Sequence, residues 1–286
     1  MGDVTDLLCS GHAACPGCIE ALSLRHVLAS VGPDAVAVIP PSCLAIMAGP
    51  QPLSGLRIPV YQPPLASAAA SASGLRRALD VRGRRDTQVV VCAGDGGTYD
   101  IGFQCLSSAA ERNENILYVC FDNEGYMNTG AQKSSSTPHY ARTGSTPAGK
   151  PTRKKNLTEI MAAHEVPYAA TASAAFLPDL KRKVQKACTM RGFRLITLLV
   201  PCLDGWGVPE DQGIALARLA VQTGVFPLYE VEDGRRYTLG EPHKSRPVRD
   251  YLEVQRRFRQ LDAAAVEALQ SEVDEGWARL QSRAAA

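Results

Sequence analysis

The stretch that decides the fold reads QVVVCAGDGG and runs from residue 88 to residue 97. Its apolar part, Gln88–Ala93, predicts a buried strand, and the glycines that follow interrupt it. A helix candidate comes next at residues 101–112, and a second apolar run, ILYVCF, occupies residues 116–121. Because a strand, a helix and another strand join as a crossover, the two strands are predicted to lie parallel and side by side.

The same alternation of strands and helices extends outward on both sides. A helix is predicted at residues 20–30 and a strand at 35–40 before this stretch, while a helix at 174–190 and a strand at 195–200 follow it. Strands that are apolar on both faces must be covered on both faces. The sequence therefore predicts an α/β fold with a single doubly wound parallel sheet.

The end of the chain departs from this alternation. Residues 225–239 predict a hairpin with its turn at Asp233-Gly234. Beyond Arg249, apolar residues recur every three or four positions, which predicts one long amphipathic helix. We therefore expect a ligand-binding domain over residues 1–248 and a helical extension over residues 249–286.

Composition limits the kinds of partner to expect. The 286 residues include 31 Lys and Arg against 29 Asp and Glu, a net charge of +2. This balance gives no reason to expect nucleic acid or a membrane surface as a partner. The N-terminal residues lack a basic region followed by an apolar run, and no apolar stretch is long enough to span a bilayer, so we expect a cytoplasmic protein. The nine cysteines, an odd number, favour free thiols and metal ligands over disulfides.

Two polar residues lie where the two central strands end. Asp95 belongs to the turn Gly94-Asp95-Gly96-Gly97, and Asn123 comes one crossover later. Because parallel strands end at the edge where open α/β sheets bind ligands, we expect these side chains to hold one Mg²⁺ between them. The glycines would let the backbone approach a diphosphate, and the next helix would offer its N-terminus to the anion. The alternative is structural, with a tight turn at 94–97 and an Asx turn at 122–125.

Two longer segments carry a resemblance to a known family. GDGGTYDIG (94–102) and DNEGYMNTGAQKSSSTP (122–138) together resemble the thiamine-diphosphate-binding β subunits of the 2-oxoacid:ferredoxin oxidoreductases. The resemblance covers most of residues 9–210 and favours the pyruvate and 2-oxoisovalerate (branched-chain) members. It implies thiamine diphosphate as the cofactor, with Mg²⁺ held by Asp95, Asn123 and the carbonyl group of Gly125.

The resemblance also implies roles for further residues. Asn128 would lie near the thiazolium ring and the substrate, and Glu20 near the cofactor, both as catalytic residues. The cofactor-binding positions implied in the same way are Gly94, Asp95, Gly96, Gly97, Asn123, Gly125, Tyr126, Asn128 and Thr129. The chain departs from the family at Ile19, where relatives often have glycine, and in the segment 40–52.

Cysteines form a second candidate site. The CPGC spacing of Cys15 and Cys18 brings two thiolates to one metal, and Cys43 follows a strand that can return beside them. Cys202, at the end of the last apolar strand, is the candidate for a fourth ligand. Four thiolates suit Zn²⁺ and a [4Fe–4S] cluster equally well. The resemblance favours the cluster, because cluster-binding members share the CxxC pair, a later cysteine and a distant PC-x-x-GW segment, here 201–206.

The resemblance implies the catalytic subunit of an enzyme that oxidatively decarboxylates a 2-oxo acid such as pyruvate. Electrons would leave through the [4Fe–4S] cluster to ferredoxin or a similar carrier, and coenzyme A would take the acyl group. The expected partners are an α subunit, which in this family carries the carboxylate that activates the cofactor, and γ/δ or ferredoxin-like subunits. The alternatives are a non-redox thiamine-diphosphate 2-oxo acid decarboxylase subunit with structural zinc, and a zinc-stabilised interaction subunit.

The segment GKPTRKK, residues 149–155, indicates a solvated basic loop at the end of a long irregular stretch, 128–156. Loops of this length inside a compact domain are usually functional or disordered. Our hypothesis is that this segment faces an anionic partner, either coenzyme A or an acidic ferredoxin.

Overall fold

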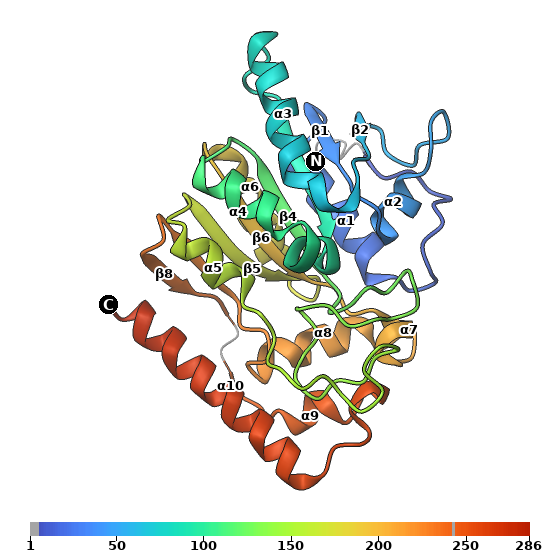
Figure 1. Ribbon diagram of the computed structural model, residues 1–286, viewed down its shortest axis with the longest axis vertical. Helices are drawn as coiled ribbons and strands as arrows, with labels where there is room; N and C mark the ends of the chain where they lie inside the picture. Colours follow the sequence, from blue (N-terminus) through green and yellow to red (C-terminus); the bar gives the residue numbers. More distant parts are fainter. Residues whose placement is uncertain (1–5, 242–243) are drawn as a thin grey trace.

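An eight-stranded sheet forms the centre of the computed structural model, which describes residues 6–241 and 244–286 (Figure 1). Residues 1–5 and 242–243 of the predicted ligand-binding domain lie outside the described residues. The strands follow the order β2-β1-β3-β4-β6-β5-β7-β8 across the sheet. Their bounds are β1 Ala35–Val38, β2 Val60–Tyr61, β3 Gln88–Gly94, β4 Leu117–Asp122, β5 Tyr168–Ser173, β6 Arg194–Leu199, β7 Tyr229–Glu232 and β8 Arg236–Leu239.

Helices cover both faces of this sheet. Their bounds are α1 Ile19–Val31, α2 Cys43–Ala48, α3 Ala68–Val81, α4 Phe103–Glu111, α5 Leu157–Ala163, α6 Leu177–Thr189, α7 Leu203–Trp206 and α8 Gly213–Gln222, with a 3₁₀ turn η1 at Leu65–Ser67. Along β3, Val90 and Cys92 enter the hydrophobic core beneath α1 and α6, whereas Val89 and Val91 enter the core beneath α3, α4 and α5. This alternation follows from the period of two in a strand, and it confirms the doubly wound α/β fold.

The ends of the central strands are aligned at one edge. Strands β1 to β6 pair in parallel, with Gly94 of β3 opposite Phe121 of β4 and Asp122 of β4 opposite Leu199 of β6. Residues that follow β3, β4 and β6 therefore emerge side by side. This confirms the expectation that Asp95 and Asn123 leave the sheet at neighbouring positions.

The helix after β3 begins earlier than residues 101–112. A π turn, η2 (Gly96–Ile101), precedes α4, and the N–H of Gly102 donates to the carbonyl oxygen of Gly97 at 2.9 Å. A Cβ atom on Gly102 would lie 2.3 Å from that same oxygen. Glycine is therefore required at position 102, and π turns of this kind are frequent at functional sites.

The last two strands in the sheet order, β7 and β8, depart from the prediction of a wholly parallel sheet. Strand β7 pairs antiparallel with β5, where Val231 lies opposite Ala169, and β8 turns back on β7. The hairpin predicted at 225–239 is confirmed. Its short connection cannot span the sheet, as a parallel crossover would require, so the sheet is mixed.

The prediction of one long helix beyond Arg249 is wrong in its first part. The segment forms α9 Arg249–Leu252, a 3₁₀ turn η3 Arg256–Phe258 and α10 Ala263–Ala284. The side chain of Asp262 caps α10 by accepting the N–H of Ala265 at 2.8 Å. Leu269 and Leu280 bury the apolar stripe of α10 against the rest of the chain, and α10 runs alongside β8 (Figure 1). Among residues 6–241 and 244–286, no helix combines the length and apolar character needed to cross a membrane.

Candidate functional site

Three groups predicted to bind a cation meet where β3 and β4 end. The outer atom of the Asn123 side-chain amide lies 2.9 Å from Asp95 Oδ1 and 2.8 Å from the carbonyl oxygen of Gly125. With nitrogen in that position the amide donates to both oxygens. With oxygen there, three oxygens converge without a donor, which is the environment a divalent cation satisfies. Asp95 and Asn123 are both buried, so the site is shielded from bulk water.

The electrostatics of Asp95 also suit a cation. Burial raises the pKa of this carboxyl well above its usual range, and the negative charge of Asp122 raises it further. A hydrogen bond donated by Ser134 Oγ and the positive charge of Lys154 oppose that rise. Because burial and a neighbouring carboxylate both penalise the ionised form, a bound divalent cation would stabilise Asp95 as a ligand.

The glycines of the turn have a steric role. A Cβ atom on Gly96 would lie 2.4–2.6 Å from ring atoms of Tyr126, and one on Gly97 would lie 2.9 Å from Leu65 Cδ1. The Tyr126 hydroxyl donates to the carbonyl oxygen of Gly96 at 2.9 Å and to Asp100 Oδ2 at 3.0 Å. Tyr126 can therefore pack across the turn only because position 96 has no side chain.

Four consecutive hydroxyl residues, 134–137, hold the segment after Tyr126 against the site. Ser134 donates to Asp95, Ser135 to Asp100, and Ser136 to Asp122. Thr137 Oγ1 donates to the carbonyl oxygen of Glu124 at 2.7 Å. The SSST part of the segment that carries the family resemblance thus fixes the acidic groups of both turns.

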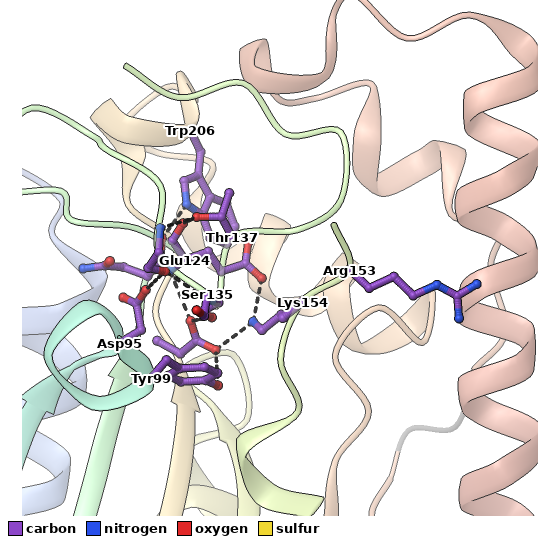
Figure 2. A network of polar contacts seen from close by, with 12 residues as sticks. Asp95, Tyr99, Glu124, Ser135, Thr137, Arg153, Lys154 and Trp206 are labelled. Atoms are coloured by element: carbon purple, nitrogen blue, oxygen red, sulfur yellow. Dashed lines mark hydrogen bonds and ion pairs between the residues drawn. The ribbon is translucent and has the colours of Figure 1, made fainter. Parts of the chain in front are cut away.

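Glu124 and Lys154 belong to a network of polar contacts beside Asn123 (Figure 2). Lys154 Nζ lies 2.7 Å from Asp122 Oδ2 and 2.9 Å from Glu124 Oε1, and Arg257 Nη2 lies 2.6 Å from Glu124 Oε2. Tyr99 donates its hydroxyl to Asp122 Oδ2 at 3.1 Å. Burial alone would raise the pKa of Glu124, but the charges of Lys154 and Arg257 outweigh it and lower that pKa. Glu124, the residue that follows Asn123, is therefore held as an ion inside the protein.

The hypothesis that the segment 149–155 faces an anionic partner is not supported at Lys154 and Lys155, whose ammonium groups bond within the chain. Lys154 is turned into the buried network, and Lys155 Nζ donates to the carbonyl oxygen of Tyr99 and lies 4.7 Å from the centroid of the Phe103 ring. Arg153 is the exposed cation of this part of the segment, and Figure 2 shows it pointing away from the network. The lysines are turned inward because buried carboxylates and carbonyl oxygens require donors.

The predicted cysteine ligands lie in one neighbourhood without converging. Cys18 is the N-cap of α1, Cys43 is the first residue of α2, and Cys202 is the N-cap of α7, where its Sγ accepts the N–H of Gly205 at 3.4 Å. Burial raises the pKa of the Cys43 thiol to about 12, with smaller contributions from Glu20, Cys202 and other nearby groups. In the described part of the chain, no three His, Cys, Asp or Glu side chains are placed to hold one metal ion.

Similarity to known proteins places this site in a family. Residues 54–198 match the model of the thiamine pyrophosphate enzyme, C-terminal TPP binding domain. Pyruvate synthase subunit PorB of Methanocaldococcus jannaschii is 44% identical over 277 residues, covering 93% of each chain. Ketoisovalerate oxidoreductase subunit VorB of Pyrococcus horikoshii is 44% identical over 287 residues, covering 96% of this chain and 92% of the relative.

The chain belongs to the β subunits of the 2-oxoacid:ferredoxin oxidoreductases.

A solved structure supports the fold of this β subunit. It is similar, with a TM-score of 0.63 and 21% identity, to a chain of the 2-oxoglutarate:ferredoxin oxidoreductase from Magnetococcus marinus, over 93% of this chain and 95% of that one. That structure was solved with 2-oxoglutarate, coenzyme A and succinyl-CoA bound. At this identity the likeness shows a shared fold.

The remaining predicted residues of the β subunit occupy different positions. Asn128 and Thr129 are exposed, on the segment that leaves the turn after Tyr126. Glu20 is buried, one of its carboxylate oxygens has no hydrogen-bond partner among residues 6–241 and 244–286, and burial raises its pKa to about 7. A hydrogen bond with Asn123 opposes that rise, so Glu20 lies beside the turn 122–125.

Sequence reasoning missed the residues that hold the turn from outside. Lys154 was interpreted as solvated, and Arg257 and Trp206 were not considered in this role. Trp206 donates its indole N–H to the carbonyl oxygen of Asn123 at 2.8 Å. No local sequence signal marks Lys154 or Arg257 for this role, because each lies far along the chain from the turn it contacts.

Proposed function

We propose that this β subunit catalyses, together with partner subunits, the thiamine-diphosphate-dependent oxidative decarboxylation of a 2-oxo acid of the pyruvate or branched-chain type. The observation that carries the proposal is the convergence of Asp95, Asn123 and Gly125 where β3 and β4 end. The names of the relatives support the substrate class, since they are subunits of pyruvate synthases and ketoisovalerate oxidoreductases. All are oxidoreductase subunits, so the non-redox decarboxylase and the zinc-stabilised interaction subunit are not favoured.

The residues of the turn would hold the cofactor through Mg²⁺. Asp95, Asn123 and the carbonyl oxygen of Gly125 supply the hard oxygen ligands that Mg²⁺ prefers. Thiamine diphosphate, when bound, supplies an electron sink for the carbanion left by decarboxylation. The chain's own part is to orient the diphosphate by the turn at 94–97 and to exclude water by burying the cation site. Asn128 and Glu20 remain proposed catalytic positions, and Tyr126 and Thr129 remain proposed cofactor contacts.

A [4Fe–4S] cluster is proposed at Cys15, Cys18, Cys43 and Cys202, where it would supply one-electron transfer. Four thiolates match the number of ligands that such a cluster takes. Three of the four cysteines, Cys18, Cys43 and Cys202, lie at the N-termini of α1, α2 and α7. The N–H of Gly205, directed at Cys202 Sγ, is the kind of hydrogen bond that tunes cluster potential.

The partners are proposed from the family. An α subunit would supply the carboxylate that activates the cofactor, and γ/δ or ferredoxin-like subunits, with ferredoxin, would take the electrons. Coenzyme A would accept the acyl group, and the assembly would work in the cytoplasm. We also propose the division into a cofactor domain, 1–248, and an extension, 249–286, which packs on that domain through Tyr251, Leu252 and Leu269.

The test is to purify the complex anaerobically with its partner subunits and to measure iron, acid-labile sulfide and bound thiamine diphosphate per copy of this chain. The double variant Cys43→Ser, Cys202→Ser should lose about four irons, the content of one [4Fe–4S] cluster, and keep thiamine diphosphate. Asp95→Asn should lose thiamine diphosphate and keep the iron. Each variant serves as the control for the other. Zinc in place of iron, or no loss of iron in the double variant, would reject the cluster, and unchanged thiamine diphosphate in Asp95→Asn would reject the cofactor site.

A further inference from the structure

Arg257, in the extension at η3, reaches back into the cofactor site. Its side chain is buried, and its Nη2 lies 2.6 Å from Glu124 Oε2. Its guanidinium carbon lies 3.7 Å from the centroid of the Trp206 ring, a distance at which cation–π attraction is strong. One arginine from the end of the chain therefore contacts both the turn after β4 and helix α7.

The contact with Glu124 acts on the predicted Mg²⁺ ligands. Glu124 stands between Asn123 and Gly125, and its backbone has a φ of +64°, which is uncommon for a residue with a side chain. Such a conformation persists only where surrounding contacts hold it. Arg257 holds one carboxylate oxygen of Glu124, and Lys154 holds the other.

The contact with Trp206 acts on the same turn through the backbone of Asn123. The Trp206 indole N–H donates to the carbonyl oxygen of Asn123 at 2.8 Å, and Arg257 stacks on the indole ring. Trp206 is the last residue of α7, the short helix whose N-cap is Cys202. Arg257 is thus joined to the backbone of Asn123 through Trp206 and to that of Glu124 through its carboxylate.

Arg257 is itself held in place. Its Nε donates to Gln255 Oε1 at 2.8 Å, its Nη2 lies 3.2 Å from the Tyr251 hydroxyl, and its carbonyl oxygen accepts the N–H of Arg142 at 3.0 Å. Only a planar guanidinium can stack on a ring while donating in its own plane to a carboxylate. A lysine would keep the charge near Glu124 but lose the stacking.

We propose that Arg257 is a positioning residue that fixes the turn 122–125 in the geometry that binds the Mg²⁺–diphosphate. This inference rests on the proposed function, because it assumes the cofactor binds at Asp95, Asn123 and Gly125. It assigns the extension a role inside the cofactor site. Arg257 acts on this turn through Glu124 and Trp206.

The experiment measures the Kd of thiamine diphosphate by equilibrium dialysis on the cofactor-stripped complex, at several Mg²⁺ concentrations. Arg257→Ala should raise the Kd at least tenfold and raise the Mg²⁺ concentration needed for half-saturation, whereas Arg257→Lys should lie between Arg257→Ala and the wild type. Arg259→Ala, an exposed arginine two residues along, is the matched control and should leave the Kd unchanged. In the fully loaded enzyme, the KM for the 2-oxo acid should stay within twofold.

A second variant separates positioning from a loss of folding. Arg257→Ala leaves Glu124 with one buried partner, so Glu124→Gln is combined with it to remove the unpaired charge. If Arg257 acts through Glu124, the double variant binds thiamine diphosphate no more weakly than Arg257→Ala, and the two effects do not add. Additive effects, or an unchanged Kd in an Arg257→Ala complex whose unfolding temperature falls, would overturn the proposal. A wild-type complex that binds no thiamine diphosphate would instead reject the proposed function.

Discussion

At the scale of single residues, the site depends on charges buried around one amide. Asp122 and Glu124 flank Asn123, and Lys154 bridges the two carboxylates while Arg257 holds Glu124 from the other side. Removing one partner from such a buried set leaves a charge without compensation, and that costs far more than an exposed ion pair contributes. The geometry of the turn 122–125 therefore depends on the positively charged side chains of Lys154 and Arg257.

We predict that Lys154→Met lowers the free energy of unfolding of this chain by about 3–5 kcal/mol, because Asp122 and Glu124 lose the cation they share inside the protein. Urea denaturation at neutral pH measures the change. Lys181→Met is the matched control, since Lys181 is exposed on α6, and it should change the stability by less than about 0.5 kcal/mol. A cost below about 1 kcal/mol for Lys154→Met would mean that the bridge contributes little.

At the scale of elements, the antiparallel edge strand is joined to a helix by a second set of ion pairs. Glu230 of β7 accepts hydrogen bonds from Tyr168 of β5 at 2.6 Å and from Arg182 and Lys186 of α6 at 2.6 and 3.0 Å. The strand that departs from the parallel pattern is thus linked to the covering helix by side chains as well as by the backbone ladder. These contacts make the edge pH-sensitive.

Burial raises the pKa of Glu230, but the hydrogen bonds from Arg182, Tyr168 and Lys186 outweigh it and lower that pKa from 4.5 to about 2. Since the folded pKa lies below the unfolded one, the stabilisation is complete above pH 4.5 and is lost as the pH falls toward 2. We predict that Glu230→Gln costs about 1–3 kcal/mol at pH 7 and progressively less below pH 4. Denaturation of the wild type and of Glu230→Gln across this pH range measures the cost, and Glu267→Gln, at an exposed position, is the control. A cost that stays constant with pH would contradict the assignment.

At the scale of the whole molecule, the extension has two separate tasks. Arg257 contacts Glu124 in the turn 122–125, whereas α10 covers one edge of the fold with Leu269 and Leu280. Arg153, beside the buried Lys154, pairs with Glu272 and Glu275 of α10 at 3.3 and 3.2 Å. The extension is thus part of the fold of this chain.

If α10 and Arg257 act independently, substitutions under α10 should change the stability of the chain without changing the binding of thiamine diphosphate. Leu269→Ala combined with Leu280→Ala should lower the free energy of unfolding by about 2–5 kcal/mol per site, because each deletion leaves a cavity in the packing under α10. The Kd of thiamine diphosphate should stay within about twofold, since neither side chain reaches the turn. Urea denaturation and equilibrium dialysis measure the two quantities. A rise in Kd as large as that of Arg257→Ala would show that the packing of α10 also controls the binding of thiamine diphosphate.

The sequence by itself determined the frame of this protein. The apolar runs at 88–93 and 116–121 with a helix between them indicated parallel neighbours, and parallel neighbours must end at the same edge. The adjacency of Asp95 and Asn123 was expected from this geometry, because strands joined by a short crossover most often lie side by side. The segment 122–138 added the family. These inferences rest on local patterns and on a rule of connection, both of which can be read without knowing long-range contacts.

Only the tertiary structure decided what holds the turn. Glu124 contacts Lys154, which is 30 positions away in the sequence, and Arg257, which is 133 positions away. No periodic pattern in the sequence between them predicts these contacts. For the same reason the basic segment 149–155 was misread: a lysine's sequence neighbours do not show whether a buried carboxylate faces it. The break between α9 and α10 was hidden as well, because apolar spacing continues through it. Burial of charge is a property of packing, and packing is fixed by parts of the chain that the local sequence does not contain.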